Sequence, residues 1–290
     1  MKRTHPASLY SEPRHQPSEE SALLSLRRLN QDLLAAREIQ SRFLPGRLPH
    51  VAGLDYSGDC QPAGEAAGDF FDFRRPIEKE LFVWVGDVSG HGFGAAILMS
   101  GIQSFLRGVT SRGSSEMPGV VEELNRSVCQ VAPDNIYVTL FYAHVDPQRR
   151  EVRYVNAGHE PPLLLRRRTG STQRLDSTGT VLGLTGRAVY EERTIRIDPG
   201  DVLVAFTDGV TEATDIEGQQ WGENGVLNVL RRCKHARLSE LVAEMLESAA
   251  RFADPTAPAD DRTAVVVRLT DSAERTSQGE EATELAFAAA

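Results

Sequence analysis

Apolar and polar positions alternate along most of the chain between residues 50 and 270, with a period that changes from segment to segment. Nine segments carry β-branched or aromatic residues in alternation or in short runs, which predicts strands. They are Leu54–Gln61, Phe70–Arg74, Leu81–Val85, Tyr137–Asp146, Glu151–Asn156, Leu163–Arg166, Thr194–Ile197, Asp201–Phe206 and Thr263–Leu269. Helical spacing predicts helices over Gly94–Val109, Met117–Gln130, Gly222–Arg232 and Leu238–Phe252. Short turns such as Asp146-Pro147 indicate antiparallel neighbours, so we expect an α+β layered domain.

Ahead of this domain, residues 20–46 have the pattern of a linker helix that Pro45 and Gly46 end. A seam of residues recurs there at steps of four and three, as in a short coiled coil: Ala22, Leu26, Leu29, Leu33, Ala36, Gln40 and Phe43. Two interpretations remain open, namely a helix packed on its own domain and a homodimer contact through residues 21–43 that couples a signal. The polar flanks 1–19 and 271–290 lack periodicity, and we expect disorder in both.

The stretch Leu81–Met99 combines a strand, an acidic loop and a helix. Its strand is expected to stop at Asp87, and the glycines around His91 give the following loop backbone freedom. A carboxylate fixed beside a flexible loop suits a hard cation, although an ordinary turn with a capping aspartate has the same pattern.

Four acidic segments share this arrangement, each at a strand end or turn. They are Gly68-Asp69-Phe70-Phe71-Asp72, Gly86-Asp87-Val88, Thr207-Asp208-Gly209 and Asp260-Asp261-Arg262. Each segment taken alone is typical of a turn. Several carboxylates at one edge repel one another unless a cation compensates, so together they indicate a metal site. Oxygen ligands without histidine or cysteine favour Mg²⁺ or Mn²⁺, and two such ions can activate a water for attack on a phosphoryl group.

Five motifs occur in a fixed order: GDFFD, GDVSGHGFGAAILM, NAGHEPPLLL, FTDGVTEA and DDRTAVVV. They resemble the motifs of the PPM-type, metal-dependent serine/threonine phosphatases, in the SpoIIE/RsbU-like bacterial branch, over about Leu54 to Leu269. The segment REIQSRFLP also resembles the helix that leads into that branch's catalytic domain. The resemblance implies an α-β-β-α sandwich of two antiparallel sheets flanked by helix pairs, with a centre of two Mn²⁺ or Mg²⁺ ions, and in some members a third.

Carried over by position, the resemblance makes Asp87 the bridging ligand and adds the backbone carbonyl of Val88. Asp208 and Asp260 complete the shell of the first ion, and Asp69 serves the second directly or through water. Asp261 is the rival of Asp260, since neighbouring acids cannot be separated by sequence. Asp72 is interpreted as a structural residue and not as a metal ligand.

Some positions depart from the family pattern. The first motif usually reads Gly-Gly-Asp, whereas this chain has Ala67 before Gly68, and alanine tolerates positive φ less well. A phosphate-binding arginine near that motif has no clear counterpart here. His91 is interpreted as a loop-structuring residue, with an acid-catalyst role as the alternative, and His159 is expected to order a turn near the site.

Composition removes several classes of protein. The chain has 290 residues and a net charge of −9, which argues against a nucleic-acid partner. Its three cysteines are widely spaced and predict neither a disulfide framework nor a zinc site. No apolar run reaches the length of a membrane span and no signal-peptide core is present, so we expect a cytoplasmic protein without a membrane partner.

These observations lead to one main hypothesis. The chain is expected to be a protein serine/threonine phosphatase in which a metal-bound water attacks phosphorus directly. By resemblance, its substrate is a phosphorylated STAS-fold anti-sigma-factor antagonist in a partner-switching pathway. Input is expected from an upstream regulator or from dimerisation. The alternative is a catalytically silent relative that binds a phosphoprotein. A nucleotide cyclase, suggested by GDFFD alone, lacks the surrounding nucleotide-binding pattern.

Overall fold

The structure is a computed structural model that describes residues 19–46, 48–64, 66–76, 80–90, 92–112, 116–257 and 259–270. Expectations for residues 1–18 and 271–290 therefore lie outside the described residues. None of the described helices is long and apolar enough to cross a membrane.

Ten strands form two five-stranded sheets within the described part of the chain. The first sheet has the order β1-β10-β9-β6-β7, from Leu54–Gln61, Arg262–Leu269, Val202–Phe206, Leu163–Leu165 and Thr172–Arg174. The second has the order β2-β3-β4-β5-β8, from Phe70–Arg74, Leu81–Val88, Val138–Asp146, Glu151–Ala157 and Arg193–Arg196. Every pair of neighbouring strands is antiparallel, as the short turns predicted.

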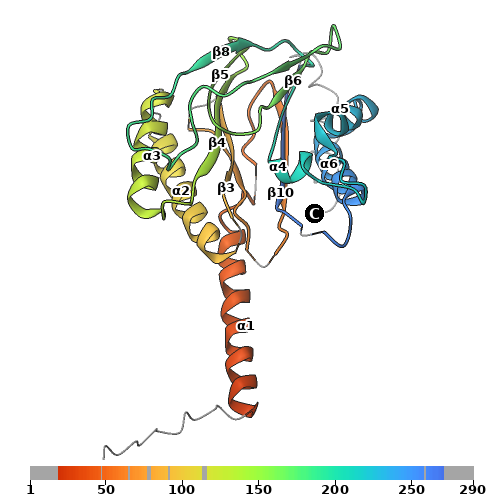
Figure 1. The fold of residues 1–290 in the computed structure, drawn as a ribbon. Helices are drawn as coiled ribbons and strands as arrows, with labels where there is room; N and C mark the ends of the chain where they lie inside the picture. The colour runs from red at the N-terminus through yellow and green to blue at the C-terminus, as the bar shows by residue number, and fades with distance from the viewer. Residues whose placement is uncertain are drawn as a thin grey trace, which may run out of the picture.

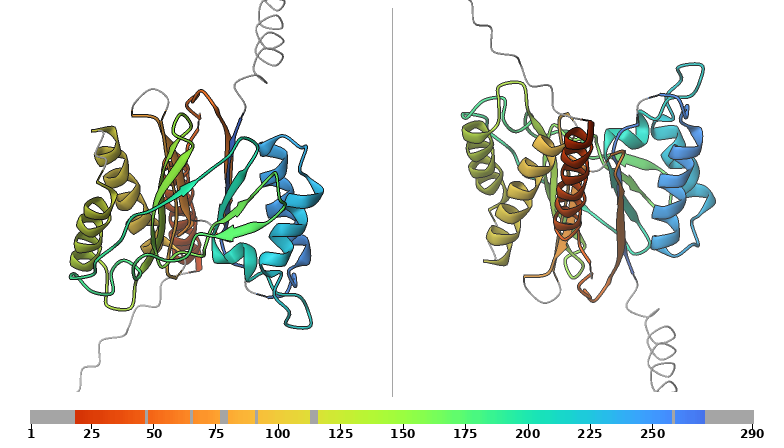
Figure 2. Two further views of the ribbon diagram at one scale, coloured as in Figure 1. Left: turned by 90° about the horizontal axis from the view of Figure 1, so that it is seen from above. Right: turned by 90° about the horizontal axis from the view of Figure 1, so that it is seen from below.

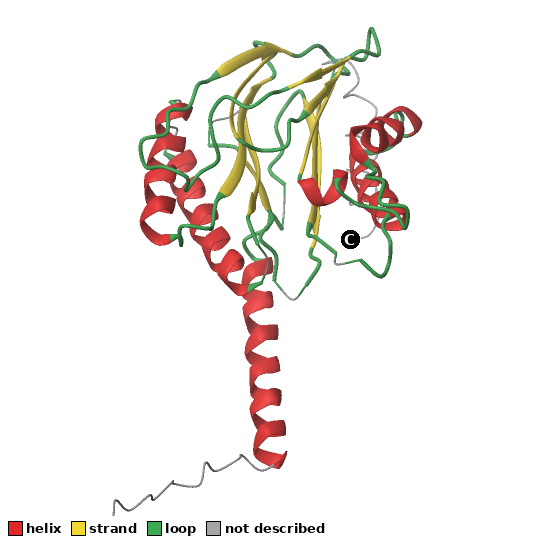
Figure 3. Cartoon of the chain, viewed as in Figure 1, coloured by secondary structure: helices red, strands yellow, loops and turns green. Residues whose placement is uncertain are grey.

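Helices cover the outer face of each sheet (Figures 1 and 2). The second sheet is covered by α2 (Phe93–Ser111) and α3 (Met117–Val131). The first sheet is covered by the short α4 (Asp208–Thr211) together with α5 (Gly222–Arg232) and α6 (Leu238–Phe252). Figure 3 shows the resulting layers, with the strands between two groups of helices. The expected α-β-β-α sandwich is thereby confirmed.

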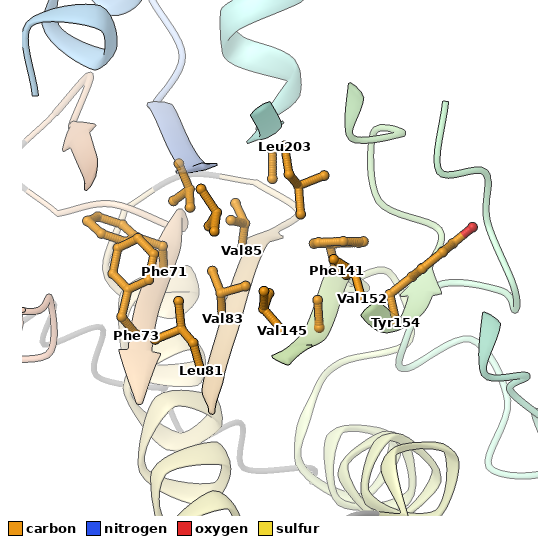
Figure 4. Close-up of a cluster of buried hydrophobic side chains, with 14 of the residues drawn as sticks. Phe71, Phe73, Leu81, Val83, Val85, Phe141, Val145, Val152, Tyr154 and Leu203 are labelled. Atoms are coloured by element: carbon orange, nitrogen blue, oxygen red, sulfur yellow. The ribbon is translucent and has the colours of Figure 1, made fainter. Parts of the chain in front are cut away.

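Strand periodicity explains how one sheet buries both of its faces. In β3, Leu81, Val83 and Val85 point between the two sheets, where they pack among Phe71, Phe141 and Leu203 (Figure 4). The alternate residues Phe82 and Trp84 point to the other side and pack against α2 and α3. Because successive side chains of a strand face opposite ways, a nearly continuous apolar run is what a doubly covered strand requires.

The predicted elements are all present, although many bounds are displaced by one or more residues and the linker helix ends at Ser41, before Pro45. Three further differences matter more. β3 continues to Val88 and does not end at Val85, since Asp87 and Val88 still pair with Thr139 and Val138 of β4. Asp87 therefore lies inside a strand and not after one. The sequence prediction missed β7, whose three exposed residues have no apolar pattern, and the four-residue helix α4.

The linker helix α1 (Glu19–Ser41) extends away from the sandwich, and only its last turn meets the domain (Figure 1). Gln40 bonds to the loop before β2, and Phe43 packs beside the α2–α3 layer. Leu34 and Ile39 are exposed, while the side chains of Ala22, Leu26 and Leu29 lie outside the described residues. The interpretation of a helix packed on its own domain thus holds only at the C-terminal end of the seam.

Gly86 offers a test of how tightly β3 is packed. A Cβ atom there would lie 2.6 Å from the carbonyl oxygen of Thr139 and would also clash with the ring of Phe70. We expect Gly86→Ala to lower the free energy of unfolding by about 2 kcal/mol, because a buried strand cannot take up the extra volume. The measurement is urea denaturation followed by circular dichroism.

Gly101 provides the matched control, since it lies inside α2 with open space around its Cα. Gly101→Ala should leave stability unchanged or raise it by up to about 1 kcal/mol, as alanine favours a helix interior. Equal effects of the two substitutions would contradict the packing described for β3.

Candidate metal centre

The four acidic segments meet at one edge of the sandwich because the strand register brings them there. In the second sheet Phe70 pairs with Gly86, so Asp69 and Asp87 follow on neighbouring strands at the same edge. In the first sheet Phe206 pairs with Ala264, which places the Asp208 and Asp260 segments together. In Figure 1 this edge lies where α4 begins.

Asp69 joins the two sheets. It is buried at the start of β2, yet its Oδ2 accepts hydrogen bonds from the hydroxyls of Thr207 (2.7 Å) and Thr263 (2.6 Å), both from the other sheet. The backbone N–H of Thr263 also donates to the Thr207 hydroxyl oxygen, which ties the two threonines together. Burial, followed by the charge of Asp87, raises the pKa of Asp69 well above its ordinary value.

Asp87 occupies the middle of the acidic edge. Burial raises its pKa to about 7, and the charges of Asp208, Asp260 and Asp261 act in the same direction. Gly68 permits this arrangement, because a Cβ there would lie 2.8 Å from the carbonyl oxygen of Val88 and 3.2 Å from Oδ1 of Asp87. The Gly68 loop therefore packs directly against both groups that the sequence assigned to the centre of the site.

Asp260 and Asp261 have different surroundings, which the sequence could not distinguish. Both carboxylate oxygens of Asp261 are taken by backbone amides, those of Ala63 and Gly68, each at 2.7 Å, and the side chain is buried. Asp260 is exposed and only caps the N–H of Asp261. Asp261 thus holds the loop before Asp69, whereas Asp260 has oxygen atoms available to a ligand.

Asp208 begins α4 and faces Asp260. Its pKa is raised by burial first and by the charge of Asp260 next. Gly209 allows the two segments to touch, since a Cβ there would collide with the backbone carbonyl of Asp261. Within the described chain, the acidic groups line one rim without forming a closed cage of three or more ligands around a point. Such a rim of hard oxygen donors fits Mg²⁺ or Mn²⁺ better than zinc.

The remaining predicted residues are placed as follows. His91 lies outside the described residues. Asp72 is buried and forms ion pairs with Arg74 (2.8 Å) and Arg107 (2.6 Å). These contacts support the interpretation of Asp72 as a structural residue and not a metal ligand. The backbone N–H of His159 donates to Asn156, which orders the turn as expected.

The His159 ring is buried as well, with Nδ1 3.0 Å from the Thr139 hydroxyl. Burial lowers its pKa to about 3, which keeps the imidazole neutral. Because Thr139 pairs with Asp87 across the β3–β4 ladder, His159 contributes to the frame of the acidic edge and not to its charge.

Three residues that matter here were missed from the sequence. Thr207 and Thr263 belong to the FTDG and DDRT motifs. Their closeness in sequence to Asp208 and Asp261 could have indicated that they contact the acidic site. Gln40 gave no such signal, although its Nε2 donates to the carbonyl of Ala67 (2.6 Å) and its Oε1 accepts from the Ala67 N–H. The concern about Ala67 is not confirmed, because Arg150 is the one non-glycine residue with positive φ among those described.

Comparison with known proteins identifies the class. The model of the family "Stage II sporulation protein E (SpoIIE)" matches residues 78–270, so the chain belongs to this family. It is 28% identical over 190 residues to the phosphoserine phosphatase RsbU of Bacillus subtilis, covering 66% of this chain and 56% of RsbU. The chain spans between about a third and just over half the length of the curated relatives it matches.

Solved structures share the fold. The RsbU and RsbW domains of Rv1364c from Mycobacterium tuberculosis align with a TM-score of 0.67 at 28% identity, over 79% of this chain and 63% of that one. The catalytic domain of the serine/threonine phosphatase PstP, solved with two manganese ions, aligns with a TM-score of 0.56 at 15% identity. That alignment covers 75% of this chain and 99% of PstP, and it supports the fold alone.

The raised pKa of Asp87 predicts how the metal-free protein responds to pH. A carboxyl group that binds its proton more tightly when folded stabilises the fold at low pH, and this contribution is lost as pH rises from its ordinary 3.8 through about 7. In EDTA we expect the free energy of unfolding to fall, on the order of 3 kcal/mol, between about pH 5 and pH 8.

Manganese should reverse this trend, because ligands must lose their protons to bind a cation. Asp87→Asn should reduce the slope in EDTA, since asparagine does not titrate, while Asp69 and Asp208 continue to contribute to it. Denaturant titrations across the pH range measure both effects. A metal-free stability that stays level or increases toward pH 8 would contradict the carboxylate crowding described here.

Proposed function

We propose that the chain is a metal-dependent protein serine/threonine phosphatase that hydrolyses phosphoserine or phosphothreonine. One observation carries this proposal: the strand register brings Asp69, Asp87, Asp208 and Asp260 to a single edge of a SpoIIE-family fold. Burial and mutual repulsion raise the pKa of three of these carboxyl groups. Bound cations would compensate this repulsion and stabilise the charged form of the carboxylates.

Each residue has a separate task in this proposal. Asp87 and the backbone carbonyl of Val88 would hold Mn²⁺ or Mg²⁺ from the second sheet, and Asp208 and Asp260 would hold them from the side of the first sheet. Asp69 would serve a second ion, directly or through water. When bound, the ions supply an activated water and neutralise phosphate charge. The chain's own part is to hold these ligands at fixed positions and to need no cysteine or serine nucleophile.

The substrate is proposed to be a phosphorylated STAS-fold anti-sigma-factor antagonist in a partner-switching pathway. The similarity to RsbU and to the RsbU and RsbW domains of Rv1364c supports this choice. The exposed position of Asp260 at this edge also suits a phosphorylated side chain carried on a folded protein.

A set of aspartate substitutions tests the activity. Asp87→Asn and Asp260→Asn should each reduce manganese-dependent hydrolysis of p-nitrophenyl phosphate by about 10³-fold, equivalent to about 4 kcal/mol of transition-state stabilisation. Neither variant should lose stability, because neither carboxylate holds the backbone at long range. The rate of nitrophenol release at saturating Mn²⁺ is the measurement.

Asp261→Ala is the matched comparison, since Asp261 neighbours Asp260 but binds the amides of Ala63 and Gly68. We expect it to lower the free energy of unfolding by about 1 to 3 kcal/mol, as the buried N–H of Gly68 and the partly buried N–H of Ala63 lose their acceptor. Near-full activity of Asp87→Asn would refute the proposal. If the parent protein binds a phosphoprotein but hydrolyses neither that phosphoprotein nor p-nitrophenyl phosphate, the chain is the catalytically silent binding module.

The linker helix is proposed to form a homodimer that transmits a signal to the acidic edge. Much of α1 extends from the domain, and a second copy of the same helix could pack along the predicted seam. At the other end, Gln40 binds both backbone groups of Ala67, two residues before Asp69. A change in the position of α1 would therefore reach the loop that carries a proposed ligand.

Two adjacent leucines distinguish this dimer from unspecific association. Leu33 lies on the predicted seam and Leu34 lies off it. Leu33→Glu should shift the protein toward the monomer in sedimentation velocity, since a charge would be buried in the seam. Leu34→Glu should leave the dimer intact. A monomeric parent protein, or equal effects of the two variants, would remove the idea.

A further inference from the structure

A groove lined by arginines lies on a part of the molecule that the proposed phosphatase chemistry does not use. It forms where the end of α1, the end of β2 and the second half of α2 meet, and it encloses about 730 Å³. We call it the arginine groove after Arg42, Arg74, Arg75 and Arg107, which line it together with His50.

The groove carries an excess of positive charge in a chain whose net charge is −9. Among its lining residues, four guanidinium groups stand against the single carboxylate of Asp72. Asp72 pairs with Arg74 and Arg107, and Glu38 outside the lining pairs with Arg42 at 2.7 Å. Arg75 donates to a neutral acceptor, the carbonyl oxygen of His50 (3.0 Å). When the carboxylates of Asp72 and Glu38 are counted against the four arginines, a surplus of two positive charges remains.

The groove also has an apolar wall. Leu44, Leu48 and Phe73 line it beside the arginines, and the first two pack against the core between the sheets. A ligand that combines carboxylates with a few apolar side chains would therefore be complementary to it in both respects. A small inorganic anion would satisfy only the charge.

The last twenty residues of the sequence have this composition. Residues 271–290 contain five acidic side chains against the single basic residue Arg275, and they end in an apolar stretch that includes Leu285 and Phe287. The acidic residues are Asp271, Glu274, Glu280, Glu281 and Glu284. This segment accounts for −4 of the net charge of −9.

The described chain also delivers this segment close to the groove. The backbone N–H of Thr270 donates to the carbonyl of Gly53 at 2.9 Å, three residues from His50 in the groove lining. A flexible chain of twenty residues has a typical end-to-end distance of about 25 Å, and such a tether gives an effective concentration in the millimolar range. We propose that residues 271–290 bind the arginine groove of their own chain.

A second basic surface lies near the same exit point and serves as the competing site. Arg150, Arg167 and Arg168 line a smaller hollow beside Gly200, whose N–H donates to the carbonyl of Leu269. Asp198 and Asp201 line that hollow too, and its one apolar lining residue is a proline. Arg166 outside the lining pairs with Asp201 at 3.0 Å, so the hollow also carries a surplus of two positive charges. It differs from the arginine groove in having no wall for the apolar end of the segment.

Occupation of the groove would act on the junction between α1 and the sandwich. Arg107 donates to the carbonyl of Phe43 at 2.5 Å, and Arg42 lies directly after the end of α1. A carboxylate-rich segment lying across both arginines would brace this junction. The proposal concerns binding alone and is independent of whether the acidic edge hydrolyses phosphate.

Photo-crosslinking in the full chain tests the proposal. Phe287 is replaced by p-benzoylphenylalanine, the protein is irradiated at low concentration, and crosslinked peptides are identified by mass spectrometry. We expect crosslinks within one chain to residues 42–50 and 73–76. The crosslinked fraction should fall at least about threefold in Arg74→Gln/Arg75→Gln and at 0.5 M salt, because exposed ion pairs are individually weak and screened.

The matched control is Arg167→Gln/Arg168→Gln, which removes the same charge from the competing site and should leave the yield unchanged. Thermal unfolding of each variant confirms that it remains folded. Crosslinks to residues 150, 167–168 or 198–201, crosslinks only between chains, or an even scatter over the surface would each overturn the proposal. So would a yield that Arg74→Gln/Arg75→Gln leaves unaltered.

Discussion

The main constraint on the structure is that carboxylates which repel one another must be held close together at the edge where the two sheets meet. Asp69 is the central example, since it is buried in one sheet and bound by Thr207 and Thr263 of the other. Two hydroxyl donors lower the cost of a buried carboxylate without cancelling its charge. The same bonds fix the distance between the sheets at this edge. Sheet packing and site geometry are therefore determined by one set of contacts.

Close backbone approach is the second constraint on this edge. At Gly68 and Gly209 an added methyl group would meet a backbone carbonyl, that of Val88 or that of Asp261. Both carboxylate oxygens of Asp261 in turn accept hydrogen bonds from backbone amides of the loop that leads to Asp69. The acidic groups are thus held by a frame of glycines, threonines and one structural aspartate. A cation would find its ligands positioned in advance, which limits the reorganisation that binding requires.

The alternation of side chains made most of the fold predictable from the sequence. Residues such as Val83 and Trp84 had to face opposite layers, and that pattern correctly predicted the strand and a layered α+β domain, whereas the α-β-β-α sandwich was predicted from the family resemblance. The end of β3 was not predictable, because pairing with β4 and not composition carries the strand to Val88. The three residues of β7 are exposed, so no burial pattern marks them.

The acidic positions of the site were predictable as a group, whereas their separate tasks were not. Asp260 and Asp261 are equal in sequence, and only long-range bonds to Ala63 and Gly68 distinguish them. Gln40 illustrates a stronger limit, since it lies on a helical seam and looks like any interface residue. Its bond to Ala67 depends on where the whole helix meets the domain. Contacts between distant segments carry this information, and a local pattern does not contain it.

Charge is distributed unevenly over the sandwich, and the strands explain how. β2 begins beside Asp69 at the acidic edge and ends at Arg74, so one short strand connects surfaces of opposite sign. β10 runs the same way, from Asp260-Asp261 before its start to the exit of the chain at Thr270. The acidic edge and the arginine groove therefore lie at opposite ends of β2, and the chain leaves β10 at the end away from the acidic edge. If residues 271–290 bind as proposed, their carboxylates would be repelled by the acidic edge and attracted to the arginine groove, so the two surfaces would not compete for the same segment.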